Sequence, residues 1–539
     1  MKSIFQIISK SAYAIVVVFG FASCSNLDEV LYSGVTEDTY NYSADDLGGV
    51  IMGCYSPLNW GYVSAYWQTQ ELTGCCISTP ANASGWDDGG IYKALQFHTW
   101  TSELGQPGDL WNNYYSGVIL CNRAIEKLES GLIPIESEDI LKSSMAELKT
   151  LRAYYHWILM DNFGNIPYIT TTSQDLPEQT PRKDVYAALV EELVEEIPYL
   201  NDVQGEMMYG RMNKWAGKTL LANIYLNAQV YTGSAEWDKC LEQCNDIIES
   251  GVCALSPNFK DSFMATGVES SKEVIFTIPY DYERGVVGNY LYMNSWHQAL
   301  KRKFLTNAAP NAAGGPKGIT QFVETYDPDD SRIDDTWLRG PQYDVDGNPL
   351  MGEFDCQGQQ IDFTKELPDG YFTNEMEGWR FNKQEVLPKT EWSSSADVPL
   401  FRYAEVLLMK AECLLRLGRP GAGAIVSELR ERAFRVNPGN ALVTDAELAQ
   451  DSRIEWGKVE NYEIVDHGDI SDVEFGRLFD EWCWEFVWEG YTRRNMIRFG
   501  IFTTKTWLSH VPNGDYRIIF PIPNFAINSN SKLKQNIGY

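Results

Sequence analysis

Hydrophobic residues return every three or four positions in several separate stretches of the chain. The clearest stretch is residues 140–167, ILKSSMAELKTLRAYYHWILMDNFGNIP. Within it, Leu148, Leu151 and Tyr155 lie on one face of a helix. Gly164, followed closely by a proline, is expected to end that helix. The pattern therefore predicts one long amphipathic helix.

Two later stretches share a second plan: a long helix with small residues along one stripe, a turn, and another helix. Residues 214–233 precede such a helix at 236–251, and residues 401–420 precede one at 423–433. Small side chains let paired helices approach closely, as in tetratricopeptide-like hairpins. Residues 109–131 are expected to add an earlier helix of this kind, with irregular spacing between the copies. We therefore expect a mainly α fold in which tetratricopeptide-like helical hairpins form a scaffold.

Two long stretches between these helices have no sustained helical period. Residues 59–108 and 260–399 are rich in Gly, Pro, Asn, Asp and aromatic residues. Irregular segments of this length are usually functional or disordered, and a high aromatic content argues against disorder. We expect a large irregular, loop-rich lobe, and we expect its loops to carry the ligand site.

The N-terminus has the pattern of an export signal. Lys2 and Lys10 precede a short apolar run at residues 12–19, and the small residues Ala-Ser come directly before Cys24. The run is too short for a membrane-spanning helix. Small residues followed by a cysteine resemble the lipobox of bacterial lipoproteins, in which the cysteine is diacylated. Residues 1–23 are therefore predicted to be a lipoprotein signal peptide and Cys24 the lipidation site, the alternative being an ordinary signal peptide.

Charge and cysteine content narrow the partners further. The chain has 44 Lys and Arg against 74 Asp and Glu, a net charge of −30. Such a charge repels the phosphates of nucleic acids, so a nucleic acid partner is not expected. The ten cysteines after Cys24 are scattered through the chain, which is not the pattern of a disulfide framework. Most of them are expected to be small buried hydrophobic residues.

Four blocks in the correct order resemble one known family. They are AELKTLRAYYHWILMDNFGNIPYIT from residue 146, DVPLFRYAEVLLMKAECLLRLG from residue 397, LFDEWCWEFVWEGYTRRNMIRFG from residue 478, and the tail IIFPIPNFAINSNSKLKQNIGY. All four are similar to signatures of the SusD/RagB family. Trp482 stands where many members carry Arg, and Asn495 where Asp is usual. Both departures lie within a scaffold helix, so they leave the resemblance intact.

The resemblance implies a surface-facing lipoprotein of the outer membrane that captures oligosaccharides or polysaccharides. Members of the family sit as a lid over a TonB-dependent transporter of the SusC type and have no catalytic activity or cofactor. It also implies a division into an N-terminal region with helical repeats, 24–255, and a C-terminal region, 256–539, that includes the loop-rich lobe and the final helices. Neither the sugar nor its linkage is indicated.

Binding a sugar requires flat aromatic faces for its C–H groups and polar side chains for its hydroxyl groups. The best match is NASGWDDGGIY, where Trp86 lies in a glycine-rich turn beside Asp87 and Asp88. This position resembles the family's loop with a stacking tryptophan. Six further residues are candidates for glycan binding, with packing in the core as their alternative: Tyr290, Tyr292, Trp296, Trp67, Glu71 and Arg380.

Two other functions and one metal site stay open at this point. A glycoside hydrolase requires a carboxyl pair, and acidic residues are too common here to single one out. The row Glu481, Glu485 and Glu489 is expected to pair with Arg493, Arg494 and Arg498 instead. A peptide-binding transporter subunit of the RagB type is the second alternative. No cofactor is expected, although DVDGN at residues 344–348 is acidic enough for structural calcium; a simple turn is the default.

Overall fold

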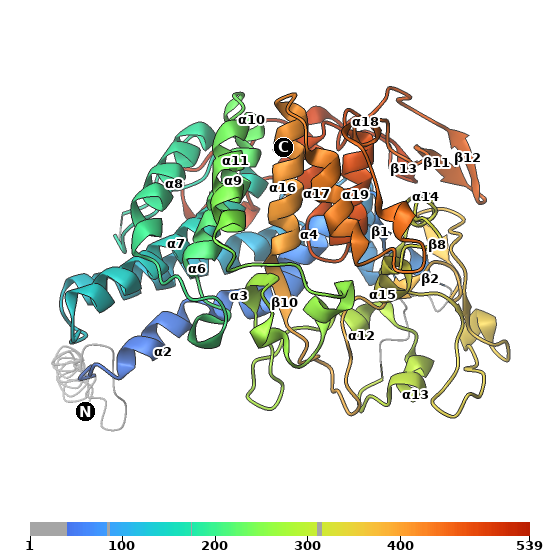
Figure 1. Cartoon of the computed structure of the whole chain (residues 1–539), viewed down its shortest axis with the longest axis horizontal. Helices are drawn as coiled ribbons and strands as arrows, with labels where there is room; N and C mark the ends of the chain where they lie inside the picture. The colour runs from blue at the N-terminus through green and yellow to red at the C-terminus, as the bar shows by residue number, and fades with distance from the viewer. Residues whose placement is uncertain (1–39, 83–86, 174, 310–314) are drawn as a thin grey trace, which may run out of the picture.

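The computed structural model describes residues 40–82, 87–173, 175–309 and 315–539. Long helices form a scaffold on one side, and short strands and loops form a lobe on the other (Figure 1). The predicted signal peptide and Cys24 lie outside the described residues. Within the described ranges, no helix combines the length and apolar character that crossing a membrane requires.

The scaffold contains most of the long helices. They are α6 (Gly105–Glu129), α7 (Glu138–Phe163), α8 (Arg182–Glu196), α9 (Lys214–Leu226), α11 (Trp237–Glu249), α16 (Tyr403–Arg416), α17 (Ala422–Glu431), α19 (Gly476–Phe486) and α20 (Thr492–Arg498). Shorter helices connect them or lie in the lobe: α2 (Asp46–Gly53), α3 (Ser56–Gly61), α4 (Gln68–Glu71), α5 (Ile91–Gln96), α10 (Ala228–Thr232), α12 (Leu291–Ser295), α13 (Lys301–Phe304), α14 (Thr320–Val323), α15 (Arg332–Thr336), α18 (Asp445–Leu448) and α21 (Asn524–Ser529).

The helix predicted from residues 140–167 is confirmed as α7. The side chain of Ser137 caps its first turn by accepting a hydrogen bond from the backbone N–H of Ile140 at 3.2 Å. Gly164 follows the last helical residue with a φ of 73°, a conformation that favours glycine, so the helix ends where the sequence indicates.

The predicted helix pairs are also confirmed. Helix α9 packs against α11, and α16 packs against α17, while α6, α7 and α8 form an earlier packed series. A Cβ atom on Gly117 of α6 would collide with the ring of Tyr155 on α7. A glycine is therefore required where these two helices cross closely. Residues 214–233 contain a break at Asn227, which separates α9 from the short α10.

The lobe is held together by short strand pairs. The longest is antiparallel, between β3 (Val274–Ile278) and β10 (Val398–Arg402), with Val398 opposite Ile278. Two-stranded pairs join β1 (Ile77–Ser78) to β4 (Lys317–Gly318), β2 (Ala81–Asn82) to β8 (Phe372–Thr373), β5 (Trp337–Leu338) to β9 (Arg380–Phe381), and β6 (Gly340–Pro341) to β7 (Asp362–Phe363). A three-stranded sheet joins β12 (Glu463–Asp466), β11 (Gly457–Glu460) and β13 (Trp507–Leu508). Because β10 runs directly into α16, the lobe and the scaffold share one core.

The cysteines after Cys24 are buried, as their distribution along the sequence predicts. The ten that follow Cys24 are all buried and free of disulfide bonds. Cys75 and Cys76, which follow α4, meet Cys483 of α19 in the core, where they and the other buried cysteines act as small hydrophobic residues.

Glu481 and Glu485 of α19, and Glu489 just after it, have different partners from those expected, so that prediction is wrong. Glu485 pairs with Arg332 of α15 (3.2 Å), with Arg402 at the end of β10 (2.9 Å) and with Arg432 after α17 (2.5 Å). Glu481 pairs with Arg332, and Glu489 with Arg402. These pairs tie the lobe to the scaffold from inside.

The helix is interrupted between residues 486 and 492, which explains why the expected ion pairs do not form. Trp488 and Gly490 both have positive φ, 78° and 81°, so α19 ends before them and α20 starts as a separate helix. The arginines of α20 then meet other groups: Arg498 pairs with Glu412 of α16 at 2.7 Å, and Arg494 donates to the hydroxyl of Tyr66 at 3.1 Å. The expected ion pairs require one uninterrupted helix, which the chain does not form here.

Candidate functional site

Two exposed tryptophans stack on each other where α3 meets the lobe. Trp60 of α3 and Trp392 of the lobe have ring centroids 5.7 Å apart and an angle of 23° between their planes. They are 50% and 37% exposed. Tyr282 meets Trp392 edge-on, with centroids 6.2 Å apart. We call Trp60, Trp392 and Tyr282 the aromatic platform. Large flat apolar groups left in water at one place indicate a binding surface.

A glycine lets the lobe reach α3. Gly288 has a φ of +139°, and a Cβ atom there would collide with the backbone carbonyl oxygen of Asn59, the residue before Trp60. The same oxygen accepts a hydrogen bond from the hydroxyl of Tyr280 at 2.6 Å. The two halves of the platform are therefore joined at a position that only glycine fits.

Serine and asparagine residues hold the loop that carries Trp392. The hydroxyl of Ser393 accepts a hydrogen bond from the N–H of Gly288 at 3.0 Å, and that of Ser395 accepts one from the N–H of Tyr282 at 3.1 Å. The side chain of Asn289 donates to the carbonyl oxygen of Ala396 at 2.8 Å. These bonds fix the platform in advance, which lowers the entropy cost of binding.

Part of the predicted site lies beside the platform. Burial raises the pKa of Tyr290 to about 12, and the hydroxyl of Ser64, four residues after Trp60, lies in contact with it. Burial also raises the pKa of Tyr92, with added contributions from Asp88 and Tyr290. Tyr92 therefore interacts with both Asp88 and Tyr290, and Tyr290 lies near Ser64, one helical turn after Trp60. Asp87 is exposed and pairs with Lys93 at 2.7 Å, and Trp86 lies outside the described residues.

Tyr292 and Trp296 do not form part of an exposed site, so predicting them as glycan-binding residues is wrong. Residues 291–295 form helix α12, and both rings are only 1% exposed. Trp296 stacks on Phe304 at 4.1 Å and donates its indole N–H to the carbonyl oxygen of Phe381 at 2.6 Å. Packing in the core, the alternative stated for these residues, is therefore what the structure shows for both.

Trp67, Glu71 and Arg380 are also core residues, each at most 1% exposed, so no ligand reaches them. Trp67 stacks on Trp488 with centroids 5.4 Å apart and an angle of 9°. Arg380 donates to the backbone carbonyl oxygens of Glu377 at 2.7 Å and Glu375 at 2.9 Å. Predicting these three as glycan-binding residues is wrong, because their polar neighbours in the sequence do not reveal the segments that cover them.

Glu71 has a structural role at the start of α20. Its Oε1 accepts hydrogen bonds from the N–H groups of Gly490 at 2.7 Å and Tyr491 at 3.0 Å, and its Oε2 accepts one from the hydroxyl of Thr492 at 2.7 Å. Burial raises its pKa to about 7, although the three donors act in the opposite direction. The carboxyl group thus stabilises the turn that connects α19 to α20.

Replacing Glu71 with glutamine is expected to flatten the dependence of stability on pH. A pKa raised above the ordinary value gives stability that is complete at low pH and is lost as the pH rises through about 7. Glutamine keeps the acceptor and carries no charge, so Glu71→Gln is expected to gain stability relative to the native chain between about pH 5 and about pH 8. Thermal unfolding across this range measures the difference. Burial also raises the pKa values of Glu405 and Asp480 to about 7. These two residues therefore contribute to the pH dependence of stability in both the native chain and the variant. Parallel curves for the two proteins would contradict the prediction.

The acidic segment at residues 344–348 forms a turn. Oδ1 of Asp344 accepts hydrogen bonds from the N–H groups of Asp346 at 3.0 Å and Asn348 at 2.8 Å. These bonds hold the pKa of Asp344 below its usual value, and Gly347 has a φ of 81°. The carboxylate therefore organises the turn, which is the default interpretation of the sequence.

The platform residues were missed by the sequence analysis, although the sequence contains a signal for them. Trp60 lies in PLNWGY and Trp392 in TEWSSS, so both are flanked by small or polar residues. The same criterion selected Trp86. Applied to all tryptophans, it would have included these two, but nothing in the sequence indicates that they stack on each other.

Comparisons with known proteins agree with this architecture. The family model described as "SusD family" matches residues 258–539, and the model described as "Starch-binding associating with outer membrane" matches residues 64–226. The Starch-binding protein SusD of Bacteroides thetaiotaomicron is 28% identical over 440 residues, covering 73% of this chain and 72% of that protein.

Solved structures show the same fold. The Surface glycan-binding protein A from Bacteroides thetaiotaomicron has a TM-score of 0.69 at 19% identity, covering 93% of this chain and 100% of the other. A structure of that protein in complex with laminarihexaose has a TM-score of 0.67 at 18% identity, covering 92% and 99%. Since the first family model spans more than half of the sequence, the chain belongs to the SusD family.

Proposed function

We propose that this protein binds glycans on the aromatic platform without cleaving them. The observation that carries the proposal is the exposed, stacked pair of Trp60 and Trp392, held in place by a hydrogen-bonded loop. Flat indole faces suit the C–H faces of sugar rings. The names of relatives, a starch-binding protein and surface glycan-binding proteins, support the same ligand class.

Polar groups around the platform can satisfy sugar hydroxyl groups. Asp88 is exposed and interacts with Tyr92, which also interacts with Tyr290. Glu391, next to Trp392, accepts a hydrogen bond from the amide of Asn307 at 2.8 Å, and this pair is exposed. Carboxylate and amide groups at a rim confer specificity because a ligand that leaves them unpaired is penalised.

We further propose that the bound glycan passes to a partner TonB-dependent transporter of the SusC type. The matched model whose description includes association with the outer membrane supports that location. Lipidation of Cys24 would tether the protein there, and two or three acyl chains anchor a protein stably.

Changing Cys24 to alanine is expected to release the protein from the membrane while leaving glycan binding intact, because the thiol is the attachment point of the lipid. Fractionation of cells that express each form measures retention, and affinity electrophoresis measures binding. If the variant still sediments with outer membranes, contact with a partner rather than lipid is the main anchor.

Native affinity electrophoresis through gels that contain single polysaccharides tests the binding proposal. The panel includes starch and laminarin, because relatives are named for starch binding or solved with laminarihexaose. Retardation by one or more polysaccharides, without release of reducing sugar, is the expected result. Sugar release by the purified protein would favour a glycoside hydrolase. Retardation by no member of the panel, together with binding to peptides, would favour a peptide-binding subunit of the RagB type.

A further inference from the structure

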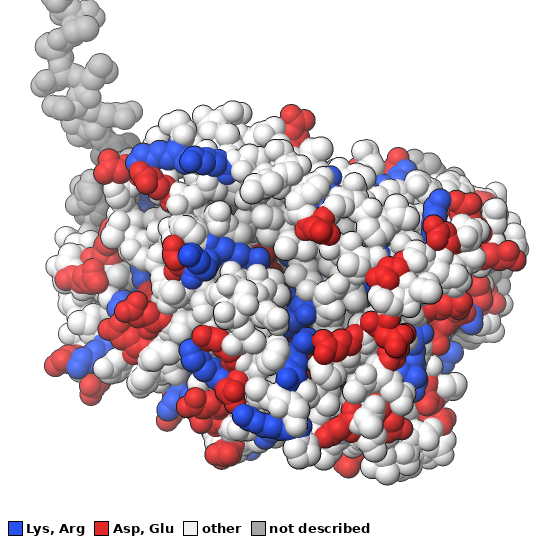
Figure 2. Space-filling model, turned by 90° about the horizontal axis from the view of Figure 1, so that it is seen from above, with Lys and Arg blue, Asp and Glu red and all other residues white. Residues whose placement is uncertain are grey.

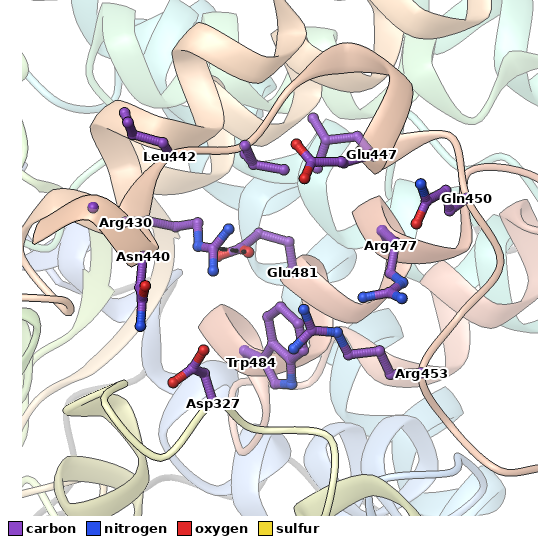
Figure 3. A pocket seen from close by; sticks show the side chains of 13 residues that line it. Asp327, Arg430, Asn440, Leu442, Glu447, Gln450, Arg453, Arg477, Glu481 and Trp484 are labelled. Carbon is purple, nitrogen blue, oxygen red and sulfur yellow. Dashed lines mark ion pairs between the residues drawn. The ribbon is translucent and has the colours of Figure 1, made fainter. Parts of the chain in front are cut away.

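A hollow of about 410 Å³ lies between α17, α18 and α19 (Figure 3). Its wall contains three arginines, one from α17, one from α19 and one from the loop before β11: Arg430, Arg477 and Arg453. Acidic and basic side chains are both spread over the face that Figure 2 shows, and three guanidinium groups line this one hollow.

Arg430 is buried without matching acceptors. Its side chain is 9% exposed, and it forms an ion pair with Glu481 whose oxygen is 3.7 Å from Nε, beyond hydrogen-bond distance (Figure 3). Nε has no hydrogen-bond partner among the described residues, and the guanidinium packs on the ring of Phe434 at 4.6 Å. A buried cation with unused donors costs free energy unless a ligand supplies the acceptors.

The other two arginines are held in place by contacts that leave guanidinium N–H donors available. The guanidinium of Arg453 lies over the indole of Trp484 at 5.5 Å, and Trp484 is held by its N–H donating to the hydroxyl of Thr325 at 2.8 Å. Nε of Arg477 donates to the carbonyl oxygen of Asp451 at 2.9 Å, which leaves its two terminal nitrogens available. In Figure 3 the three guanidinium groups lie around the same space.

Each carboxylate that lines the hollow has at least one partner of its own. Glu481 pairs with Arg332 at 2.7 Å, behind the hollow. Glu447 accepts hydrogen bonds from the N–H and the hydroxyl of Thr444 as part of a helix cap. Asp327 accepts one from the N–H of Asp329 at 2.9 Å. Although three carboxylates line the hollow, the buried Nε of Arg430 therefore remains without an acceptor among the described residues.

We propose that this hollow binds the oxyanion of an acidic sugar, a carboxylate or a sulfate group. Guanidinium groups present paired N–H donors that match such oxygens, and their partial burial strengthens the interaction. The amides of Asn440 and Gln450, which also line the hollow, can bond sugar hydroxyl groups. The site uses elements that the aromatic platform does not, so it is a separate subsite.

Titration calorimetry of the mature chain at fixed ionic strength tests the proposal with three probes: sodium sulfate, glucuronate and glucose. Sulfate or glucuronate is expected to bind and glucose is not. The variants Arg453→Gln and Arg477→Gln are each expected to weaken that binding about tenfold, because each removes charged donors to the anion. Binding of sulfate alone would identify a sulfated sugar, and binding of glucuronate alone a uronic acid.

Arg419→Gln is the matched control, because Arg419 is exposed, carries the same charge and pairs with Asp238 away from the hollow. It is expected to leave the affinity unchanged, as is the double change Trp60→Ala with Trp392→Ala, which separates this site from the platform. Equal weakening by Arg419→Gln would indicate a general charge effect and overturn the proposal. Absence of binding by both sulfate and glucuronate would overturn it as well.

Discussion

The change Glu485→Ala is expected to destabilise the fold by about 3–5 kcal/mol, since it leaves three buried guanidinium groups without their shared carboxylate. Glu485 is 0% exposed and pairs with Arg332, Arg402 and Arg432. Burial alone would raise its pKa, but these three arginines lower it to about 2. Urea unfolding followed by tryptophan fluorescence measures the loss. An effect of this size removes much of the stability of a typical domain.

The pH dependence of this loss has a definite sign. A lowered pKa gives stability that is present above the ordinary value of 4.5 and disappears as the pH falls toward about 2. The gap between the native chain and Glu485→Ala is therefore expected to narrow below about pH 4.5. If the variant does not accumulate in folded form, Glu485→Gln, which keeps the shape and two polar groups, supplies a measurable intermediate.

Glu138→Ala provides the matched control for Glu485→Ala. Glu138 also pairs with a basic residue, Lys142 at 2.8 Å, but its side chain is 78% exposed. Because water screens this pair, its removal is expected to leave the unfolding midpoint unchanged. Similar losses in the two variants would contradict the assignment of Glu485 as the central buried charge.

The double change Trp60→Ala with Trp392→Ala is expected to abolish retardation by whichever polysaccharide the native protein binds. A good stacking contact is worth about 0.5–1.5 kcal/mol in addition to the apolar area that it buries, so each ring contributes about tenfold in affinity. Both rings are exposed before binding, so the fold is expected to survive their removal. Affinity electrophoresis, with thermal unfolding of the same samples, separates loss of binding from loss of structure.

Phe372→Ala is the matched control for the platform variants. Phe372 is a large aromatic residue that is 53% exposed, but it lies on β8 rather than beside Trp60. Its removal is expected to leave retardation unchanged. If the double tryptophan variant is retarded as strongly as the native protein, the glycan binds elsewhere and the platform proposal fails.

The sequence predicted the helices well, because their signal is local. The spacing of hydrophobic residues in 140–167 and the glycine at its end gave the bounds of α7 within a few residues. The small residues of the paired helices predicted their close packing, as Gly117 against Tyr155 illustrates. In both cases the residues that decide the outcome lie within a few turns of one another or repeat along one helix face.

The site was predicted only in part, because exposure depends on distant segments. Trp67 and Trp60 both lie in the stretch predicted to be irregular, a few residues apart in the sequence. Trp67 is covered by Trp488, whereas Trp60 meets Trp392 at the surface. No local pattern distinguishes the two, since each partner lies hundreds of residues away. The ion pairs of the α19 glutamates were predicted wrongly for the same reason.

The sequence alone therefore determined the mainly helical scaffold, the resemblance to the SusD family, the expected lipidation of Cys24 and the acidic charge. Only the tertiary structure decided which aromatic rings are available to a ligand, which arginines neutralise Glu485, and where Arg430, Arg453 and Arg477 come together. The physical reason is that helix formation follows from the periodicity of neighbouring residues, whereas burial and ion pairing follow from contacts between segments that the chain brings together only when it folds.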